Sequence, residues 1–317
     1  MNTLNCKNDF NGRKQHKAFK NFRSNWQLLM LCLPAIICLF VFSYLPMSGI
    51  VIAFKDYRLA KGIFESEWAG FKNFEFFFKS QDMIIILRNT IGYGIVFIAL
   101  KIILGVFLAL VLYEVSSRRA IKYYQTTMIL PNFLSWVVVG YISYILLNPD
   151  VGILNSLLEL LGHEEIQWYT ERKYWPFILT IANSWKHVGM DMILFYAALM
   201  GIDPSYYEAA KIDGANKLQQ IKSISIPLLS SIICIQIILA LGNIIRGDFG
   251  LFYQIPRNIG TLYPVTDIID TYVQRGLTQG NMAPTAAVGL FQSVTGLILI
   301  ITANFTIKKI SPENSLF

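Results

Sequence analysis

The amino-acid sequence predicts an all-α integral membrane protein with six transmembrane helices and both termini in the cytoplasm. Two observations about composition and one about charge lead to this fold class. Hydrophobic residues make up 54% of the 317 residues and charged residues only 15%, whereas soluble domains carry about 25% charged residues. The apolar residues also gather into long uncharged runs, and about 20 apolar residues let a helix cross the hydrocarbon core of a bilayer.

The spans follow from these runs in chain order. Four runs carry no charge over 20 residues or more, namely 27–54, 123–149, 226–245 and 282–307. Two further apolar segments are interrupted by charges, 83–113 by Arg88 and Lys101, and 174–202 by Lys186 and Asp191. Counting both, we expect six helices within a transmembrane domain of residues 27–307.

The distribution of charge predicts the topology. A polar tail, residues 1–26, precedes the first run, which is too long for a signal peptide and is not followed by an A-x-A-like site. The segments on the side of this tail hold 14 basic and 6 acidic residues, and those on the opposite side hold 10 and 13. This positive-inside bias places the tail and the C-terminal residues 308–317 in the cytoplasm. The net charge of +7 therefore reflects topology and contact with anionic lipid, and no nucleic-acid surface is expected.

The residue types needed for metal binding or covalent catalysis are scattered. The four cysteines show no C-x-x-C spacing and three lie inside apolar runs, so neither a disulfide framework nor a metal site is predicted. The three histidines are far apart in the sequence: His16, His163 and His187. No catalytic residue is assigned.

A short polar stretch, "YYEAAKIDGANKL", lies between the fourth and fifth apolar segments, on the cytoplasmic side of the predicted topology. Asp203 and Pro204 before it are typical of a helix start. Gly214 is typical of a helix end in the left-handed conformation, and Asn216 with Gln219 resembles a capping box. Two short helices at the membrane surface are therefore expected.

The side chains of this segment, residues 203–227, suit protein contact. Ala209 and Ala210 are small enough to let another backbone approach closely, and Glu208 and Asp213 supply hydrogen-bond acceptors beside them. These features fit a unit that docks in a groove of a partner protein. They also fit an ordinary connecting loop with capped helices.

The pattern E-A-A-x-x-D-G-A, followed by an Ile and a Pro, resembles the EAA loop of the permease subunits of binding-protein-dependent, type I ABC importers. The matching residues are Glu208, Ala209, Ala210, Asp213, Gly214, Ala215, Ile224 and Pro227. The resemblance implies the permease fold of these importers, in which this loop is a coupling helix seated in a cleft of the ATPase subunit. Ile221 stands where many members have Phe, which is a conservative difference.

Three stretches in the first third of the chain, "YLPMSGIVIAFKDYR", "WAGFKNFEFFF" and "LRNT", resemble the polysaccharide and oligosaccharide branch of this family. That branch contains the LplB-like permeases and the first permease subunit of the alginate importer. The resemblance implies a multi-pass protein of the bacterial cytoplasmic membrane. Its substrate would be an oligo- or polysaccharide delivered by an extracellular or periplasmic solute-binding protein.

The partners follow from what the sequence lacks. It contains no G-x-x-x-x-G-K-[ST] motif and no Gly-Lys dipeptide, so it has no phosphate cradle for ATP hydrolysis. We expect this chain to be no enzyme and to bind no cofactor, with ATP and Mg on a partner ATPase. It has one coupling loop and no internal repeat, whereas two ATP-binding subunits offer two clefts. The resemblance therefore implies a heterodimer with a second, homologous permease subunit.

Charged residues inside apolar segments are candidates for the substrate pathway, because charge in a membrane is costly. Sugar permeases of this family line their central site shortly before the coupling loop and at the end of the next span. The corresponding residues here are Trp185, Lys186, His187, Asp191, Asn243 and Arg246. Pairing with neighbours, or extension to the outer interface, would also explain Lys186 and Asp191. An Arg that pairs with a uronate makes an anionic oligosaccharide a candidate substrate.

Two other classes of protein fit the sequence less well. A secondary transporter driven by an ion gradient would show broken helices in pairs or inverted repeats, and neither is visible. An intramembrane enzyme would need a convergent nucleophile and base or a metal set, which the scattered histidines do not provide.

Overall fold

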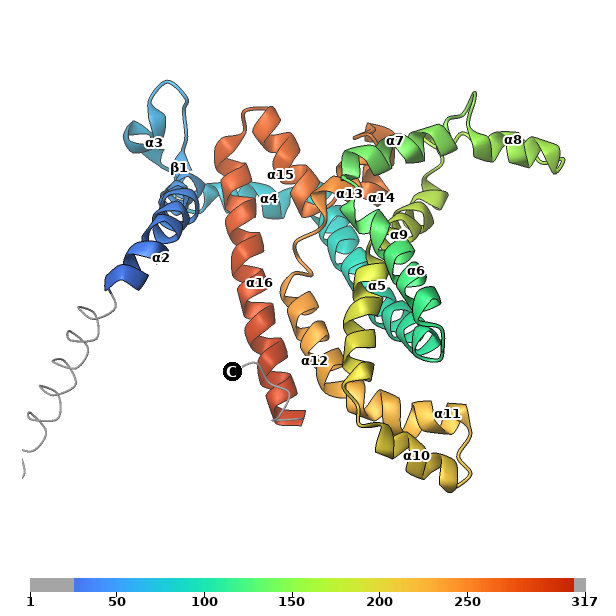
Figure 1. Cartoon of the computed structure of the whole chain (residues 1–317). Coiled ribbons are helices and arrows are strands. Elements are labelled where there is room, and N and C mark those ends of the chain that lie inside the picture. Colours follow the sequence, from blue (N-terminus) through green and yellow to red (C-terminus); the bar gives the residue numbers. More distant parts are fainter. Residues whose placement is uncertain (1–25, 311–317) are drawn as a thin grey trace, which may run out of the picture.

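The computed structural model describes residues 26–310 and shows an almost entirely helical chain (Figure 1). Within these residues the strands are β1 (Lys55–Asp56) and β2 (Glu67–Trp68), which pair antiparallel. Apart from this pair of two-residue strands, the prediction of an all-α membrane protein is confirmed. The predicted tails, 1–26 and 308–317, lie largely outside the described residues.

Four helical segments are long and apolar enough to cross a membrane: Met30–Phe54, Asp82–Tyr113, Lys217–Gly242 and Met282–Thr306. A bent pair of helices, Arg118–Phe133 and Trp136–Leu147, makes a fifth if it counts as one span. The remaining predicted span corresponds to α9 (Trp175–Met200), which has 26 residues but falls outside this group. Its polar residues, among them Lys186 and Asp191, lower its hydropathy. The structure thus supports four or five spans, and six remains a prediction.

The uncharged run 123–149 does not form one straight helix. It is divided into α6 (Arg118–Ile129), a 3₁₀ turn η3 (Leu130–Phe133) and α7 (Trp136–Leu147). The two helices meet at 96°. Pro131 lies in the turn, where it has no N–H to continue the helix, and Ser135 caps the start of α7 by accepting from the Val138 N–H at 3.3 Å.

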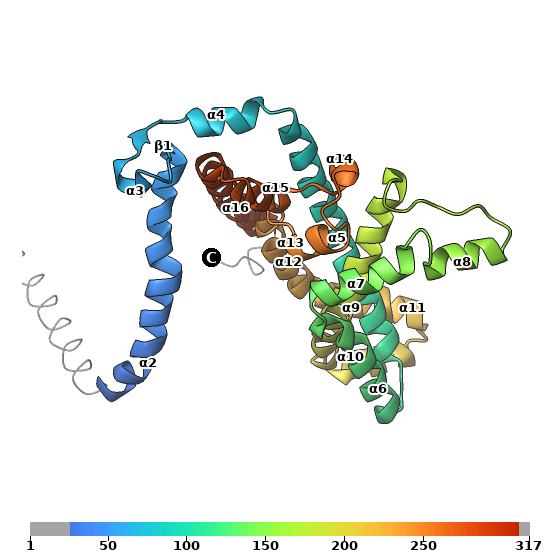
Figure 2. The ribbon, with the colours of Figure 1, turned by 90° about the horizontal axis from the view of Figure 1, so that it is seen from above.

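The N-terminal segment forms a rod whose first part, α2, stands apart from the other helices (Figure 2). It consists of α2 (Trp26–Leu39), a π-helical turn η1 (Phe40–Tyr44) and a 3₁₀ segment η2 (Leu45–Phe54). The described side chains of α2 are exposed, whereas η2 packs against α16 (Met282–Ile310). Three connecting elements then lead to α5: the β1–β2 hairpin, α3 (Gly62–Glu65) and α4 (Lys72–Lys79).

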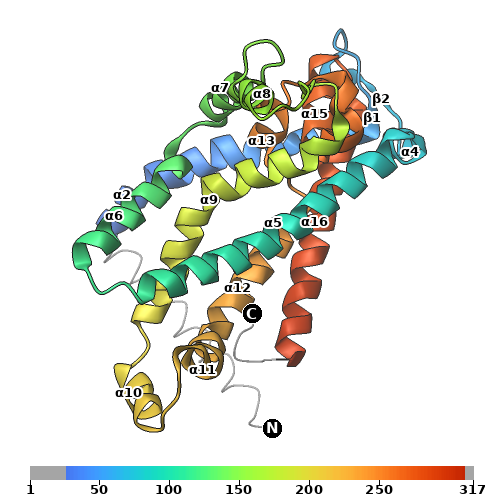
Figure 3. The ribbon, with the colours of Figure 1, turned by 90° about the vertical axis from the view of Figure 1, so that its right-hand side faces the viewer.

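The centre of the fold is the contact between α5 (Asp82–Tyr113) and α9, which run side by side (Figure 3). Gly189 allows a very close approach of α9 to α6, because a Cβ there would lie 1.9 Å from the Met128 carbonyl oxygen. Small residues at helix contacts are typical in membranes, where van der Waals packing rather than the hydrophobic effect holds helices together. One buried cluster between α5, α9 and α12 (Ile226–Gly242) comprises Ala109, Leu112, Met192, Phe195, Leu199 and Leu229.

The two ends of the helical bundle carry different elements (Figure 1). One end carries α7, α8 (Ile153–Leu160), η4 (Arg172–Tyr174), η6 (Gly260–Leu262), α14 (Tyr263–Thr266) and α15 (Ile269–Thr278). A buried ion pair between Asp267 and Arg275 and a hydrogen bond from Asn89 Nδ2 to the Asp267 carbonyl fix this end on α5. The opposite end carries α10 (Pro204–Ile212), α11 (Lys217–Gln220) and the π-helical turn η5 (Ile221–Ser225), which continues into α12 (Ile226–Gly242).

Candidate functional site

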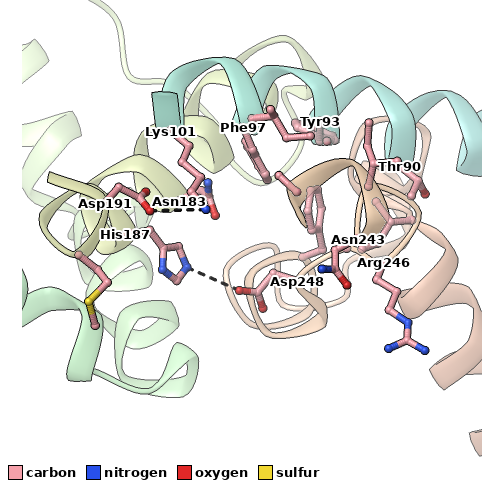
Figure 4. Close-up of a pocket in the computed structure, with 18 of the residues that line it drawn as sticks. Thr90, Tyr93, Phe97, Lys101, Asn183, His187, Asp191, Asn243, Arg246 and Asp248 are labelled. Carbon is pink, nitrogen blue, oxygen red and sulfur yellow. Dashed lines mark ion pairs between the residues drawn. The ribbon is translucent and has the colours of Figure 1, made fainter. Parts of the chain in front are cut away.

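A cavity of about 320 Å³ lies between α5, α9 and the end of α12, bordered by α13 (Phe249–Gln254) (Figure 4). Four of the six predicted pathway residues line it: His187, Asp191, Asn243 and Arg246. The segments that supply them, α9 and the end of α12, are far apart in the sequence, and the packing of α12 and α13 on α9 brings them together. The cavity also has aromatic walls, formed by Tyr93, Phe97 and Phe252.

Lys101 and Asp191 face each other across one side of the cavity. The Lys101 Nζ lies 3.7 Å from Asp191 Oδ1, and the exposed fractions of the two side chains are 32% and 16%. Lys101 thus faces the helix bundle. Because a lone charge in a membrane is costly, this pair joins α5 to α9 and makes the wall of the cavity polar without leaving a net charge.

Asp248 organises the other side of the cavity, and no sequence pattern had indicated it. Its Oδ2 accepts a hydrogen bond from Trp136 Nε1 at 2.7 Å and lies 3.9 Å from His187 Nε2. Its Oδ1 accepts from the Leu251 N–H at 3.3 Å and caps α13. Burial opposes ionisation of this carboxyl, but the nearby His187 ring and the hydrogen bonds from Trp136 and Leu251 outweigh it and lower the pKa of Asp248. The carboxylate is therefore the charged form that these three partners hold.

The other polar side chains that line the cavity differ in how many partners they have. His187 Nδ1 lies 3.1 Å from Asn132 Oδ1. Asn243 Nδ2 donates to the Leu239 carbonyl at 3.0 Å, which leaves its amide oxygen free. Neither the Asn183 amide nor the Arg246 guanidinium forms a hydrogen bond or ion pair within residues 26–310. An exposed guanidinium with all its N–H groups available suits a carboxylate or several hydroxyl groups.

Trp185 and Lys186, the other two predicted pathway residues, do not line this cavity. Trp185 is 44% exposed and borders an apolar pocket with α7. Lys186 is buried, and its Nζ donates to the backbone carbonyls of Pro131, Asn132 and Leu134. It also lies 5.2 Å from the centre of a Trp136 ring. Lys186 therefore closes the sharp bend between α6 and α7 by donating to its backbone carbonyls, of which that of Pro131 also accepts from the Leu134 N–H at 3.1 Å.

We expect Lys186→Met to destabilise the protein, because it removes the ammonium that donates to the Asn132 and Leu134 carbonyls of the bend. Each buried carbonyl that loses its partner costs about 1–3 kcal/mol. The melting temperature of the detergent-purified chain should fall clearly, whereas Lys72→Met, at an exposed position of α4, should leave it unchanged. Equal melting temperatures for both variants would show that the Lys186 ammonium is not structural.

The hairpin at the opposite end of the bundle has the predicted local structure. Asp203 Oδ1 accepts from the Ser205 N–H at 2.9 Å, and this bond lowers the pKa of the Asp203 carboxyl. Gly214 has φ 79°, the left-handed conformation expected after α10. Asn216 and Gln219 form both bonds of the capping box, at 2.7 and 2.9 Å. The predictions of two short helices, the glycine turn and the capping box are confirmed.

The hairpin is tied to the bundle through one face. Lys217 Nζ lies 2.5 Å from Glu114 Oε2 at the end of α5. The Tyr207 hydroxyl lies 3.0 Å from Ser225 Oγ, and its ring packs on Tyr113. These contacts give α10 and α11 a fixed orientation relative to α5.

The other face of the hairpin is exposed, and it carries both polar and apolar groups. Glu208, Ala209, Asp213 and Gly214 are exposed, Ala210 and Ala215 are half-buried, and Pro227 is exposed at the start of α12. Ile212 and Leu218 are 87% and 76% exposed, so both large apolar side chains are uncovered in the described chain. Sequence reasoning missed these two residues, although two large apolar side chains in an otherwise polar hairpin were a visible signal.

No group of three or more His, Cys, Asp or Glu side chains that could hold a metal ion is present in the described part of the chain. The cysteines in this part, Cys32, Cys38 and Cys234, are free thiols.

Comparison with known proteins gives a family and several relatives. Residues 101–311 match the family described as "Binding-protein-dependent transport system inner membrane component". The chain is 36% identical over 287 residues to the polygalacturonan/rhamnogalacturonan transport system permease protein YteP of Bacillus subtilis (strain 168), covering 90% of this chain and 89% of the relative. It is also 36% identical over 292 residues to protein LplB of the same organism, covering 92% and 91%.

Among solved structures, the chain is similar to a subunit of a bacterial ABC transporter involved in the import of the acidic polysaccharide alginate. The two share 31% sequence identity and superpose with a TM-score of 0.84, which covers 93% of this chain and 99% of that one. A second structure of the alginate transporter, in complex with an alginate pentasaccharide-bound periplasmic protein, gives the same TM-score and identity and covers 92% and 98%.

Proposed function

The chain belongs to the family of binding-protein-dependent transport system inner membrane components, and we propose that its cargo is an acidic oligo- or polysaccharide. It is the permease of an ABC importer, a multi-pass protein of the inner membrane and not itself an ATPase. The names of two relatives support this cargo, since one is a permease for polygalacturonan and rhamnogalacturonan and another belongs to an importer of alginate. Each of these saccharides contains uronic acids.

The main structural support for an acidic saccharide cargo is the set of side chains that line the central cavity. Its aromatic walls, among them Tyr93, Phe97 and Phe252, offer apolar faces on which sugar rings can stack. Asn183 and Asn243 supply groups that hydrogen-bond hydroxyls, and Arg246 supplies a guanidinium that can bind a carboxylate with two parallel hydrogen bonds. The charges of Lys101, Asp191 and Asp248 are already engaged within the protein. Arg246 lines the cavity and forms no hydrogen bond or ion pair among residues 26–310, although its charge acts on the nearby Asp270 carboxyl.

We propose the following assembly around this subunit. Six spans, within residues 27–307, and cytoplasmic tails, 1–26 and 308–317, place the hairpin 203–227 in the cytoplasm. There Glu208, Ala209, Ala210, Asp213, Gly214, Ala215 and Pro227 couple the permease to one of two ATP-binding subunits, which hold ATP and Mg. A second, homologous permease completes a heterodimer, and an extracellular or periplasmic binding protein delivers the saccharide. Ile212 and Leu218 anchor the hairpin in the ATPase cleft.

In the proposed coupling role, the hairpin transmits movement to the cavity wall, and no covalent chemistry takes place in this chain. The hairpin is rigidly joined to α5 through Glu114 and Tyr113, and α5 carries Lys101 in the wall of the cavity. Closure of the ATPase subunits would therefore move the hairpin and the cavity wall together. Family membership also disfavours the secondary transporter and the intramembrane enzyme as alternatives.

Replacement of Arg246 tests the proposed substrate. We expect Arg246→Gln to raise KM for uptake of trigalacturonate by about tenfold, which is the effect of one lost charge-assisted hydrogen bond. Uptake should be measured in cells that express the chain with its partner subunits and binding protein. Arg119→Gln, exposed on α6 at the far end of the bundle, is the matched control. Equal uptake of trigalacturonate by both variants would contradict the role of Arg246, and no uptake by the unmodified transporter would contradict the acidic cargo.

A further inference from the structure

A second polar groove lies outside the central cavity, between α7 and the segment that follows α13. Its volume is about 230 Å³, and it shares no lining residue with the central cavity. Five of its residues carry aromatic or polar side chains: Tyr141, Tyr253, Gln254, Arg257 and Asn258. This combination of ring faces, amides and a guanidinium is the same set of chemical groups that lines the central cavity.

The neighbours of Arg257 in the described part of the chain hold its guanidinium in place but accept no hydrogen bond from it. Its guanidinium stacks on the Tyr144 ring, with 4.1 Å between the guanidinium carbon and the ring centre. This cation–π contact restrains the position of the guanidinium without using its N–H groups as hydrogen-bond donors. Arg257 forms no hydrogen bond or ion pair within residues 26–310, although its side chain is exposed at the rim of the groove. A carboxylate is the ligand that such a guanidinium binds with two hydrogen bonds.

Two residues of the groove have a left-handed backbone conformation, which is unfavourable for residues other than glycine. Arg257 and Asn258 have φ values of 57° and 51°, and they are the non-glycine residues with positive φ within residues 26–310. Asn tolerates this conformation, whereas Arg does so rarely, and such strain gathers at functional sites. The Tyr263 hydroxyl lies 3.1 Å from Asn258 Oδ1 and 3.3 Å from its carbonyl oxygen, and thereby holds the turn.

Close helix packing completes the floor of the groove. A Cβ at Gly140 would lie 2.9 Å from the Gln254 carbonyl oxygen, so the glycine allows α7 to contact α13 directly. This contact places Tyr141 of α7 beside Gln254 of α13. The groove is therefore formed by tertiary packing and by a supported turn, rather than by a chance gap between loops.

We propose that this groove is a second binding subsite for an acidic saccharide, outside the central cavity. Arg257 would bind the carboxylate of one uronic acid residue, Gln254 and Asn258 its hydroxyls, and Tyr141 and Tyr253 its ring faces. α13 borders both sites, since Asp248 and Phe252 line the central cavity while Tyr253 and Gln254 line the groove. Because one helix borders both sites, the proposal includes contact of a longer oligosaccharide with both of them. The inference rests on the proposed acidic cargo and adds that KM for uptake depends on the length of the oligosaccharide.

Uptake of two galacturonate oligomers by the complete transporter tests this subsite. We expect Arg257→Gln to raise KM for hexagalacturonate by about tenfold, because one charge-assisted hydrogen bond is lost, and to leave KM for digalacturonate within about twofold. Arg58→Gln, an exposed external arginine whose ion pair is with Asp56, should change neither value. If Arg257→Gln and Arg58→Gln give the same hexagalacturonate uptake, the subsite is refuted while the acidic cargo stands. If the unmodified transporter takes up neither oligomer, the proposed cargo fails instead.

A second measurement reports on the groove without relying on transport. In a background without other cysteines, the Asn258→Cys variant of the complete transporter is labelled with a charged thiol reagent. Hexagalacturonate should slow the labelling several-fold, whereas maltohexaose, which has no carboxylates, should not. A thiol that is unreactive in the complete transporter would show that a partner subunit covers the groove, and equal labelling with and without hexagalacturonate would show that no saccharide binds there. Either result overturns the inference.

Discussion

Gly214→Val is expected to reduce substrate-stimulated ATP hydrolysis by the complete transporter by about 100-fold, which is the effect of losing a central hot spot of a protein interface. Gly214 has φ 79°, and a β-branched residue is a genuine outlier in that region. The glycine turn also supports the end of α10, because the Ala215 N–H donates to the Ala210 carbonyl at 2.9 Å. Valine would reopen this turn and misplace the exposed face of the hairpin.

The measurement is ATP hydrolysis in proteoliposomes with binding protein and saccharide, together with co-purification of the ATPase subunits. Gly201→Ala is the matched control, since Gly201 has an ordinary helical φ of −83° and a Cβ there would lie 3.4 Å or more from other atoms. Ile212→Ser keeps the turn but removes an apolar anchor, so it should also weaken ATPase association. Normal coupled hydrolysis in both Gly214→Val and Ile212→Ser would refute the docking role of the hairpin.

Asp191→Asn is expected to lower the free energy of unfolding by about 3 kcal/mol, because it leaves the Lys101 ammonium without its counter-ion in the wall of the cavity. The estimate is at the low end for buried pairs, since the Lys101 side chain keeps a third of its exposure. The pair also holds α5 against α9, so its loss should reduce transport along with stability. Thermal unfolding in detergent and saccharide uptake are the two readouts.

The double variant Lys101→Met/Asp191→Leu separates a structural pair from a substrate-binding one. Replacing a buried ion pair by apolar residues of similar size is often neutral for stability, so the double variant should recover most of the melting temperature lost in Asp191→Asn. Glu75→Gln, which breaks an exposed pair with Lys79 on α4, should leave the melting temperature unchanged. If Asp191→Asn melts like the unmodified protein, the pair does not hold these helices together.

The features that could be predicted from the sequence depend on neighbours along the chain. The uncharged runs indicated membrane spans because the bilayer demands about 20 apolar residues from each helix that crosses it. The hairpin was predictable in detail because Asp203, Gly214, Asn216 and Gln219 act on backbone groups only two or three residues away. Family resemblance then suggested which face of the chain meets the ATPase, since the motif is continuous.

The features that could not be predicted depend on partners far away in the sequence. Charge alone marked Lys186 and Asp191 equally as pathway candidates, but Lys186 donates to carbonyls 52–55 residues earlier while Asp191 pairs with Lys101 in the cavity wall. Asp248, unnoticed in the sequence, accepts a hydrogen bond from Trp136, 112 residues away. The bend of 96° between α6 and α7 interrupts an apolar run that carries no charge to mark it. A hydrophobic pattern shows that a side chain is inside a membrane, but the packing of α5, α9 and α13 decides which group it meets there.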